Sequence, residues 1–145
     1  MTGHVIALSE AVSLGFHGMG LLAASKKRLS AREMAKILGV SEAHLTKVFQ
    51  RLGHEGLVGS VRGPGGGFEL KRLPEKISLL SIYYAIEGVP RENMKFCSCC
   101  GRCPFEHCLF GAVLGDASRD FLKYLDGVTL DAISLKPAEK SARKA

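Results

Sequence analysis

Residues 30–72 of this chain read SAREMAKILGVSEAHLTKVFQRLGHEGLVGSVRGPGGGFELKR, which predicts two short helices followed by a β-hairpin. Ser30 can cap the first helix, and Glu33 completes a capping box with it. Gly39 is suited to end that helix in the left-handed conformation, and Ser41 can cap the second helix. Two capped helices joined by a short glycine-containing turn are typical of a helix-turn-helix.

Apolar residues in the two predicted helices recur at helical spacing, so each helix should bury one stripe. The expected stripe residues are Met34, Ala35, Ile37 and Leu38 in the first helix and Leu45, Val48, Phe49 and Leu52 in the second. The opposite face of the second helix carries side chains that reach phosphates and base edges. These residues are Glu42, Ala43, Thr46, Lys47, Gln50 and Arg51, with His44 near the first turn. We expect Gly53 and Gly56 to close the second helix.

Residues 58–62 and 68–72 are short alternating runs on either side of Gly-Pro-Gly-Gly-Gly at 63–67, the pattern of a β-hairpin. After a helix-turn-helix, such a hairpin is a wing, and its glycines let the backbone lie close to a sugar-phosphate edge. A phosphate-binding loop is excluded because neither Lys-Ser nor Lys-Thr follows the glycines and no helix is predicted there. The predicted DNA-contacting residues are Ser41, Ala43, His44, Thr46, Lys47, Arg51, Arg62, Gly65 and Gly66.

The charge of the chain is concentrated in the same region. Residues 26–76 contain 11 Lys or Arg against 5 Asp or Glu, an excess that equals the net charge of +6 of the whole chain. The rest of the chain is therefore neutral. A basic block next to a neutral remainder favours one half that binds a polyanion and another half with a different task.

Three further helices are predicted around this segment. Residues 8–24 form one, capped by Ser9, with glycines at 15, 18 and 20 that would allow another helix to pack closely; residues 77–87 form the next, stopped by Gly88. A long amphipathic helix runs from about His107 to 127. Its apolar face consists of Phe110, Val113, Leu114, Ala117, Phe121 and Leu125. That face is either core or a dimer seam, and the seam is favoured because the helix lies beyond the winged unit.

The predicted fold class is mainly α with a small β-hairpin wing: a winged helix-turn-helix plus a long C-terminal dimerisation helix. Four regions follow along the chain. Residues 1–88 form the DNA-binding domain, 89–108 a cysteine-rich sensor loop, 109–135 the dimerisation helix with a C-terminal segment, and 136–145 a charged tail expected to be disordered. No run of 18 apolar residues and no signal peptide occurs, so we expect a cytoplasmic protein without a membrane span.

All five cysteines fall within residues 97–108, at Cys97, Cys99, Cys100, Cys103 and Cys108. In a reducing cytoplasm, such crowding favours metal binding or redox sensing over structural disulfides. An iron–sulfur cluster is the preferred interpretation, because thiolates are the soft ligands that such clusters need. Tetrahedral zinc on Cys97, Cys100, Cys103 and Cys108, a metal-free thiol switch, and purely structural cysteines stay open as alternatives. His107 is interpreted as a surface histidine rather than a ligand.

Three stretches together resemble the Rrf-two family of IscR/NsrR-type bacterial transcription regulators. They are Ser-Val-Arg-Gly-Pro-Gly-Gly-Gly-Phe-Glu-Leu at 60–70, Glu87-Gly88 before the cysteines, and Thr129-Leu130-Asp131 after the long helix. The resemblance covers about residues 6–135. It implies a homodimeric winged-helix protein whose long C-terminal helix forms the dimer interface. It also implies a 2Fe–2S or 4Fe–4S cluster, held in several members by three cysteines in the loop before that helix.

The family's three cysteines map onto Cys97, Cys103 and Cys108. The first gap of five residues matches the family, whereas the second has four instead of five, and Cys99 and Cys100 are additional thiols. In 2Fe–2S members a histidine follows the third cysteine by three residues, and here that position is Gly111. In 4Fe–4S members that sense nitric oxide, a carboxylate from the partner's N-terminal region completes the site. The matching position here is Ser13, with Glu10 one turn earlier.

The expected function follows from both halves. We expect a homodimeric regulator that binds a palindromic DNA operator, with an affinity controlled by an iron–sulfur cluster that senses iron–sulfur status, nitric oxide or redox stress. The alternatives are a thiol- or zinc-based redox regulator without iron and, less favoured, an iron–sulfur electron carrier. An enzyme is not expected, because the sequence shows no Ser/His/Asp arrangement, paired carboxylates or nucleotide loop that would support hydrolysis or group transfer.

Overall fold

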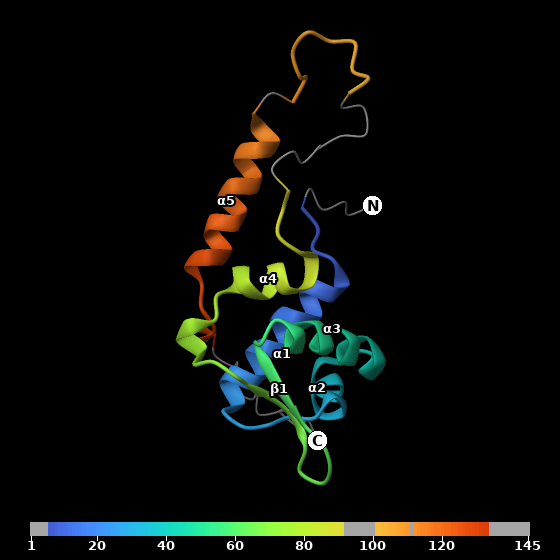
Figure 1. Cartoon of the computed structure of the whole chain (residues 1–145), viewed down its shortest axis with the longest axis vertical. Helices are drawn as coiled ribbons and strands as arrows, with labels where there is room; N and C mark the ends of the chain where they lie inside the picture. Colours follow the sequence, from blue (N-terminus) through green and yellow to red (C-terminus); the bar gives the residue numbers. More distant parts are fainter. Residues whose placement is uncertain (1–5, 92–100, 111, 134–145) are drawn as a thin grey trace, which may run out of the picture.

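The structure is a computed structural model that describes residues 6–91, 101–110 and 112–133. Helices and one hairpin follow each other along the chain (Figure 1). The elements are α1 Glu10–Ser25, α2 Ala31–Leu38, α3 Glu42–His54, β1 Val58–Val61, β2 Gly67–Leu70, α4 Leu79–Glu87 and α5 Val113–Gly127, with short 3-10 turns η1 Pro74–Lys76 and η2 Leu130–Ala132. The prediction of a mainly helical winged helix-turn-helix is confirmed.

The helix starts are fixed by the predicted caps. The Ser30 hydroxyl accepts from the Glu33 backbone N–H at 3.1 Å, and the Glu33 carboxylate accepts from the Ser30 N–H at 2.7 Å. Gly39 ends α2 with φ of 67°, and Ser41 caps α3 by accepting from the His44 N–H at 3.3 Å. Each such cap stabilises a helix by about 0.5–2 kcal/mol. The end of α3 differs from the prediction, since Gly53 lies inside the helix, which ends at His54.

Helices α1 to α4 and the hairpin form one unit, called here the winged unit. Helix α1 lies at its centre, and α3 and α4 pack against α1. Two of its glycines make this approach possible. A Cβ atom at Gly18 would lie 2.5 Å from the Phe49 ring of α3, and one at Gly15 would lie 2.3 Å from the Ile86 side chain of α4. The expectation that these glycines allow close helix packing is therefore confirmed.

The wing is an antiparallel hairpin in which Val58 pairs with Leu70 and Val61 with Gly67. A third backbone segment joins it, because Leu29 and Phe68 exchange N–H···O bonds of 3.1 and 2.7 Å. Gly67 has φ of +140°, and a Cβ there would lie 2.5 Å from the Leu29 carbonyl oxygen. Only glycine fits this position, so the loop before α2 and the wing form one unit.

Helix α5 is attached to the winged unit at its C-terminal end and rises away from it past α4 (Figure 1). The Phe121 ring meets the Tyr83 ring of α4 edge-on, with centroids 6.2 Å apart. After the helix, Val128 accepts from the Leu79 N–H at 2.8 Å. Among the described residues, α5 is covered unevenly: Leu125 is 2% exposed, whereas Val113 near the start is 69% exposed.

The structure corrects two sequence-based expectations. The long helix begins at Val113 rather than near His107, and residues 107–110 are not helical. Apolar spacing shows which residues share a face, but it does not mark a start, and Ala112 offers no capping side chain. Ile37 does not belong to the buried stripe of α2, because its side chain is 61% exposed. Within the described residues, no helix is long and apolar enough to cross a membrane. The predicted tail 136–145 lies outside the described residues.

Candidate nucleic-acid interface and cysteine loop

Helix α3 is held by its buried stripe, which is as predicted. Leu45, Val48, Phe49 and Leu52 are at most 5% exposed. With that face fixed, Ala43, Lys47 and Gln50 lie exposed on the other side, and Thr46 is half-buried with its hydroxyl donating to the Glu42 carbonyl at 2.8 Å. Because packing of the buried stripe fixes the helix, the polar side chains on its outward face have defined starting positions.

One edge of α3 faces the wing. Thr46 and Gln50 line a groove of about 470 Å³ together with Arg62 of the wing. His54, one turn beyond Gln50, and Ser60 of β1 line the same groove. Sequence reasoning placed Gln50 on the outward face but left it out of the predicted contact set, and it missed His54. The spacing of four residues from Thr46 to Gln50 to His54 was the available signal.

The other edge of α3 faces α1 and the end of α4. His44, Lys47 and Arg51 line a second hollow of about 220 Å³ with Glu10. The His44 Nδ1 atom lies 3.6 Å from the Glu10 carboxylate, and Arg51 Nη1 donates to the Ile86 carbonyl at 3.3 Å. The structure thus divides the predicted contact residues between two edges of one helix. Arg51 in particular is engaged with the last turn of α4.

The wing turn needs glycine at Gly66, where a Cβ would lie 2.3 Å from the Val61 carbonyl oxygen. Arg28 braces this turn from outside the hairpin. Its guanidinium donates to the Glu69 carboxylate at 2.8 and 3.1 Å and to the Gly65 carbonyl at 3.4 Å. Sequence analysis missed Arg28, because 41 residues separate it from Glu69 and no local pattern links them.

The carboxyl group of Glu33, at the start of α2, has a lowered pKa. The Ser30 backbone N–H donates to the Glu33 carboxylate and, with the Ser30 side chain and the Lys27 charge, holds the pKa of that carboxyl below its usual range. Glu33 is therefore ionised at neutral pH. Its negative charge therefore offsets part of the positive charge beside it, that of Lys27 in particular.

Two of the predicted ligands, Cys103 and Cys108, lie in the described part of the chain. Both are exposed free thiols in residues 101–110, directly before α5. Cys97, Cys99 and Cys100 lie outside the described residues. Among the residues that the structure does describe, no group of three His, Cys, Asp or Glu side chains could hold a metal ion. The chemistry of the donor set, exposed thiols in a loop, nevertheless suits an iron–sulfur cluster or zinc.

Glu10 and Ser13, the two residues compared above with the N-terminal carboxylate ligand of the family, both lie on α1. Glu10 is the first residue of the helix, is exposed, and lies beside His44 of α3. Ser13 is half-buried one turn later, and its carbonyl oxygen lies 2.7 Å from His17 Nδ1. A carboxylate at Glu10 is therefore accessible from outside the subunit, whereas Ser13 offers only a hydroxyl.

Comparison with known proteins places this geometry in a family. A family model described as "Rrf2: Iron-dependent Transcriptional regulator" matches residues 8–135. The transcriptional repressor NsrR of Streptomyces coelicolor is 32% identical over 110 residues, which cover 75% of this chain and 73% of that protein. The transcriptional regulator IscR of Aliivibrio salmonicida is 33% identical over 95 residues, covering 63% of this chain and 54% of that protein. The chain thus spans about half the length of this relative.

Solved structures of similar regulators share the fold of this chain. IscR of T. potens superposes with a TM-score of 0.69 at 27% identity, covering 88% of this chain and 85% of that one. CymR (YrzC), described as the global cysteine regulator of B. subtilis, superposes with a TM-score of 0.66 at 26% identity, covering 88% and 95%.

Proposed function

Because the chain belongs to the Rrf2 family of transcriptional regulators, we propose that it binds double-stranded DNA as a homodimer and that an iron–sulfur cluster sets its affinity. The observation that carries the DNA-binding part is the groove between α3 and the wing. There Thr46, Gln50 and Arg62 converge in the region that holds the whole net charge of the chain. Polar side chains on a rigid helix, next to a basic wing, are what groove recognition requires.

In this arrangement α3 enters the major groove. Gln50 and Thr46 reach base edges, since amide and hydroxyl groups can pair with them, and Lys47 and Arg62 contact phosphates. Gly65 and Gly66 let the wing backbone approach the sugar-phosphate edge. Two copies related by a two-fold axis would read half-sites about one helical turn apart, so the operator is a palindrome.

The cluster would be held by Cys103 and Cys108 with Cys97, and by Cys99 or Cys100 as a further ligand. When bound, it supplies a response to iron supply, nitric oxide or oxidants, because a cluster on an exposed loop is readily altered. The chain's own thiolates hold it directly before α5. The beginning of α5 therefore takes its position from the state of the loop.

Contacts at the end of α4 connect that loop to α3. Helix α4 ends at Glu87, which leads into the cysteine region. Its last turn is bonded to α3 through Arg51, which donates to Ile86, and to the α1 cap through Ser9, which donates to Glu87 at 2.5 Å. A displacement of the end of α4 would therefore act directly on α3, which carries the recognition face, and on the start of α1, which packs against α3.

Anaerobic purification tests the cofactor. We expect a coloured protein that contains iron and acid-labile sulfide, and Cys108→Ser should lose both while it keeps its helical circular dichroism. Duplexes selected from a random-sequence pool provide the DNA probe. The loaded and cluster-free forms should differ at least tenfold in affinity for a selected palindrome at fixed salt. Equal affinities of the two forms would remove the cluster from the regulatory mechanism.

Arg62→Ala tests the DNA interface separately. It should weaken binding about three- to tenfold for all sequences and lower the salt dependence by about one counterion, as expected for a lost phosphate contact. Lys123→Ala on the outer face of α5 is the matched control and should leave both quantities unchanged. An unaltered salt dependence in Arg62→Ala would argue against the wing contact.

A second candidate is a regulator that senses through its thiols or through zinc. The similarity to CymR, described as a cysteine regulator, and the exposure of Cys103 and Cys108 favour it. A colourless protein with one zinc per chain, or DNA affinity that responds to peroxide and dithiothreitol without iron, would select this candidate over the cluster.

A further inference from the structure

The hairpin of the wing borders a hollow on the face that is turned away from α3. Phe68 of β2 packs on the Phe49 ring of α3, with centroids 4.9 Å apart, so Glu69 and Lys71 lie on the opposite face of the hairpin. A hollow of about 590 Å³ lies on that side, between β2 and the end of α1. Among the described residues, its lining includes five basic side chains and one acidic one: Lys26, Lys27, Arg28, Lys71, Arg72 and Glu69.

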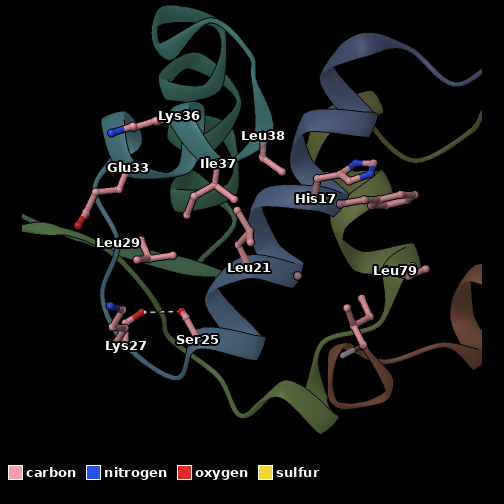
Figure 2. Close-up of a pocket in the computed structure, with 13 residues that line it drawn as sticks. His17, Leu21, Ser25, Lys27, Leu29, Glu33, Lys36, Ile37, Leu38 and Leu79 are labelled. Atoms are coloured by element: carbon pink, nitrogen blue, oxygen red, sulfur yellow. Dashed lines mark hydrogen bonds between the residues drawn. The ribbon is translucent and has the colours of Figure 1, made fainter. Parts of the chain in front are cut away.

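Carboxylates offset two of these five cations. The Arg28 guanidinium donates to the Glu69 carboxylate at 2.8 and 3.1 Å. Glu33, drawn between Lys27 and Lys36 in Figure 2, lies near enough to Lys27 for the lysine charge to contribute to its lowered pKa. Arg28 and Lys27 are therefore left out of the positive charge that a ligand of the hollow would meet.

The other three cations are not offset in this way. Lys26, Lys71 and Arg72 are exposed, and in the described part of the chain none of them has a carboxylate within 4 Å. Glu75, the next acidic residue along the chain, lies in η1 and does not line the hollow. The hollow therefore retains an excess of positive charge, which suits a polyanion.

The hollow is continuous with the proposed DNA contact at the wing turn. Arg28, in its lining, also donates to the Gly65 carbonyl of that turn at 3.4 Å. Lys71 extends over Gly59 of β1, where a Cβ atom would lie 3.3 Å from the Lys71 Cε. A duplex that touches the turn and continues past the wing therefore runs next to this face. Residues 67–72 span roughly 20 Å at about 3.3 Å per residue, a length over which DNA carries on the order of ten phosphates.

From this charge and this continuity we infer that Lys26, Lys71 and Arg72, called here the outer wing face, bind the phosphate backbone of the DNA that flanks each operator half-site. The inference rests on the proposed DNA-binding function and extends it beyond the bases that α3 reads. Ammonium and guanidinium groups that contact phosphates carry no sequence information. The outer wing face therefore adds affinity and salt dependence, and no preference for the sequence of the flank.

The backbone of Lys26 makes a clean test of this surface possible. Lys26 ends α1 in the left-handed region, with φ of 54° and ψ of 23°. It is the one residue other than glycine with positive φ in the described part of the chain. Glycine adopts this region without the steric cost that a Cβ atom brings. Lys26→Gly thus removes the charge from the outer wing face and keeps the turn.

Two duplexes test the inference: the selected palindrome alone, and the same palindrome with about ten further base pairs at each end. Fluorescence anisotropy of the full chain over a series of salt concentrations gives both affinities. The flanked duplex should bind at least about fivefold more tightly at low salt. Its salt dependence should be steeper by roughly two to four counterions, because each of two protomers neutralises one or two more phosphates. A different flank sequence should leave both quantities unchanged.

Variants assign the gain to the outer wing face. Lys26→Gly combined with Lys71→Gln should abolish most of the gain from the flanks, while its affinity for the bare palindrome changes less than about twofold. Its thermal midpoint should not fall, since glycine suits the end of α1. Lys36→Gln combined with Lys123→Gln is the matched control. It removes two charges from exposed positions outside the outer wing face and should keep the gain.

The outcomes separate this surface from the proposed function. Equal binding of the two duplexes by the wild type, a gain that persists in the Lys26, Lys71 variant, or an equal loss in the control pair would overturn the inference and leave DNA binding through α3 intact. Failure to bind either duplex would refute the proposed DNA binding itself, and this surface with it.

Discussion

The winged unit and helix α5 bury their apolar residues to very different extents. In the winged unit, Phe49 and Leu45 are fully buried, and glycines of α1 let whole helices approach. On α5, Leu125 is buried, but Val113 and Tyr124 are 69% and 64% exposed. The winged unit therefore completes its core within one chain, whereas the described residues cover only part of α5. The exposed apolar side chains of α5 support the homodimer proposed above, whereas the winged unit is already packed.

The largest effect should come from the core of the winged unit. Phe49→Ala removes a fully buried ring and should lower the free energy of unfolding by about 3–5 kcal/mol. Phe121→Ala, on the covered side of α5, should cost only about 1–2 kcal/mol, since its ring is half-exposed against Tyr83. Urea unfolding followed by circular dichroism measures both. Equal losses would mean that α5 is packed as tightly as the winged unit.

The exposed stripe of α5 should matter for association rather than folding. The predicted seam also included Phe121 and Leu125, but Phe121 packs on Tyr83 and Leu125 is 2% exposed. Val113 and Ala117 of that seam share an exposed face with Tyr124, and we propose this face as the dimer contact. Ala117→Glu would place like charges near the two-fold axis and should raise the dimer dissociation constant at least about a hundredfold, or about 2.7 kcal/mol. Analytical ultracentrifugation measures it, with Lys123→Glu on another face as the control. A wild-type chain that sediments as a monomer would refute the proposed homodimer.

Removing the Arg28 hydrogen bonds to the wing should have a smaller effect on stability. Arg28→Ala removes the hydrogen bonds to Glu69 and Gly65, while the backbone pairing of Leu29 with Phe68 remains. The pair is partly exposed, so the free energy of unfolding should fall by less than about 1 kcal/mol. A loosened wing should weaken DNA binding about three- to fivefold, measured by fluorescence anisotropy. Glu69→Gln should show part of the same loss. Full DNA affinity in Arg28→Ala would mean that the turn is held by its glycines alone.

The smallest effect concerns pH. The folded pKa of Glu33 lies below the ordinary value of 4.5, so its ionised form stabilises the folded state above that pH. This contribution should be lost as the pH falls through the lowered folded value. The difference in thermal midpoint between the wild type and Glu33→Gln should accordingly be present at pH 7 and shrink below 4.5. Glu55→Gln serves as a control at the other helix of the pair. A difference that grows in acid would contradict the capping-box assignment.

Much of the winged unit was predictable, because its signals are local. Ser30 with Glu33, Gly39 and Ser41 act within a few residues, and the structure places each where the sequence predicted it. The glycine contacts of α1 were predicted in kind, although not which helices they would meet. Ile37 was predicted wrongly, because helical spacing gives a stripe without showing how far a neighbouring helix covers it.

The sequence predicted which residues belong to the candidate site, but not how they are arranged in space. The residues of α3 were identified from the sequence, but their division between the wing edge and the α1 edge depends on where α1, α4 and the hairpin pack. Arg51 illustrates this, since its hydrogen bond to Ile86 joins residues 35 positions apart. The crowding of the cysteines indicated a metal or redox site, and the family resemblance implied which of them are ligands. The structure adds that Cys103 and Cys108 are exposed directly before α5.

The sequence by itself determined the helix starts, the hairpin, the concentration of positive charge and the cysteine window, because capping, turn chemistry and periodicity depend on neighbours within about one or two turns. The tertiary structure alone decided which polar residues of α3 face the wing, that Arg28 braces it, that the described residues cover only part of α5, and that Ile37 stays exposed. These outcomes depend on contacts between residues far apart in sequence, and such contacts are fixed only when all the elements pack together.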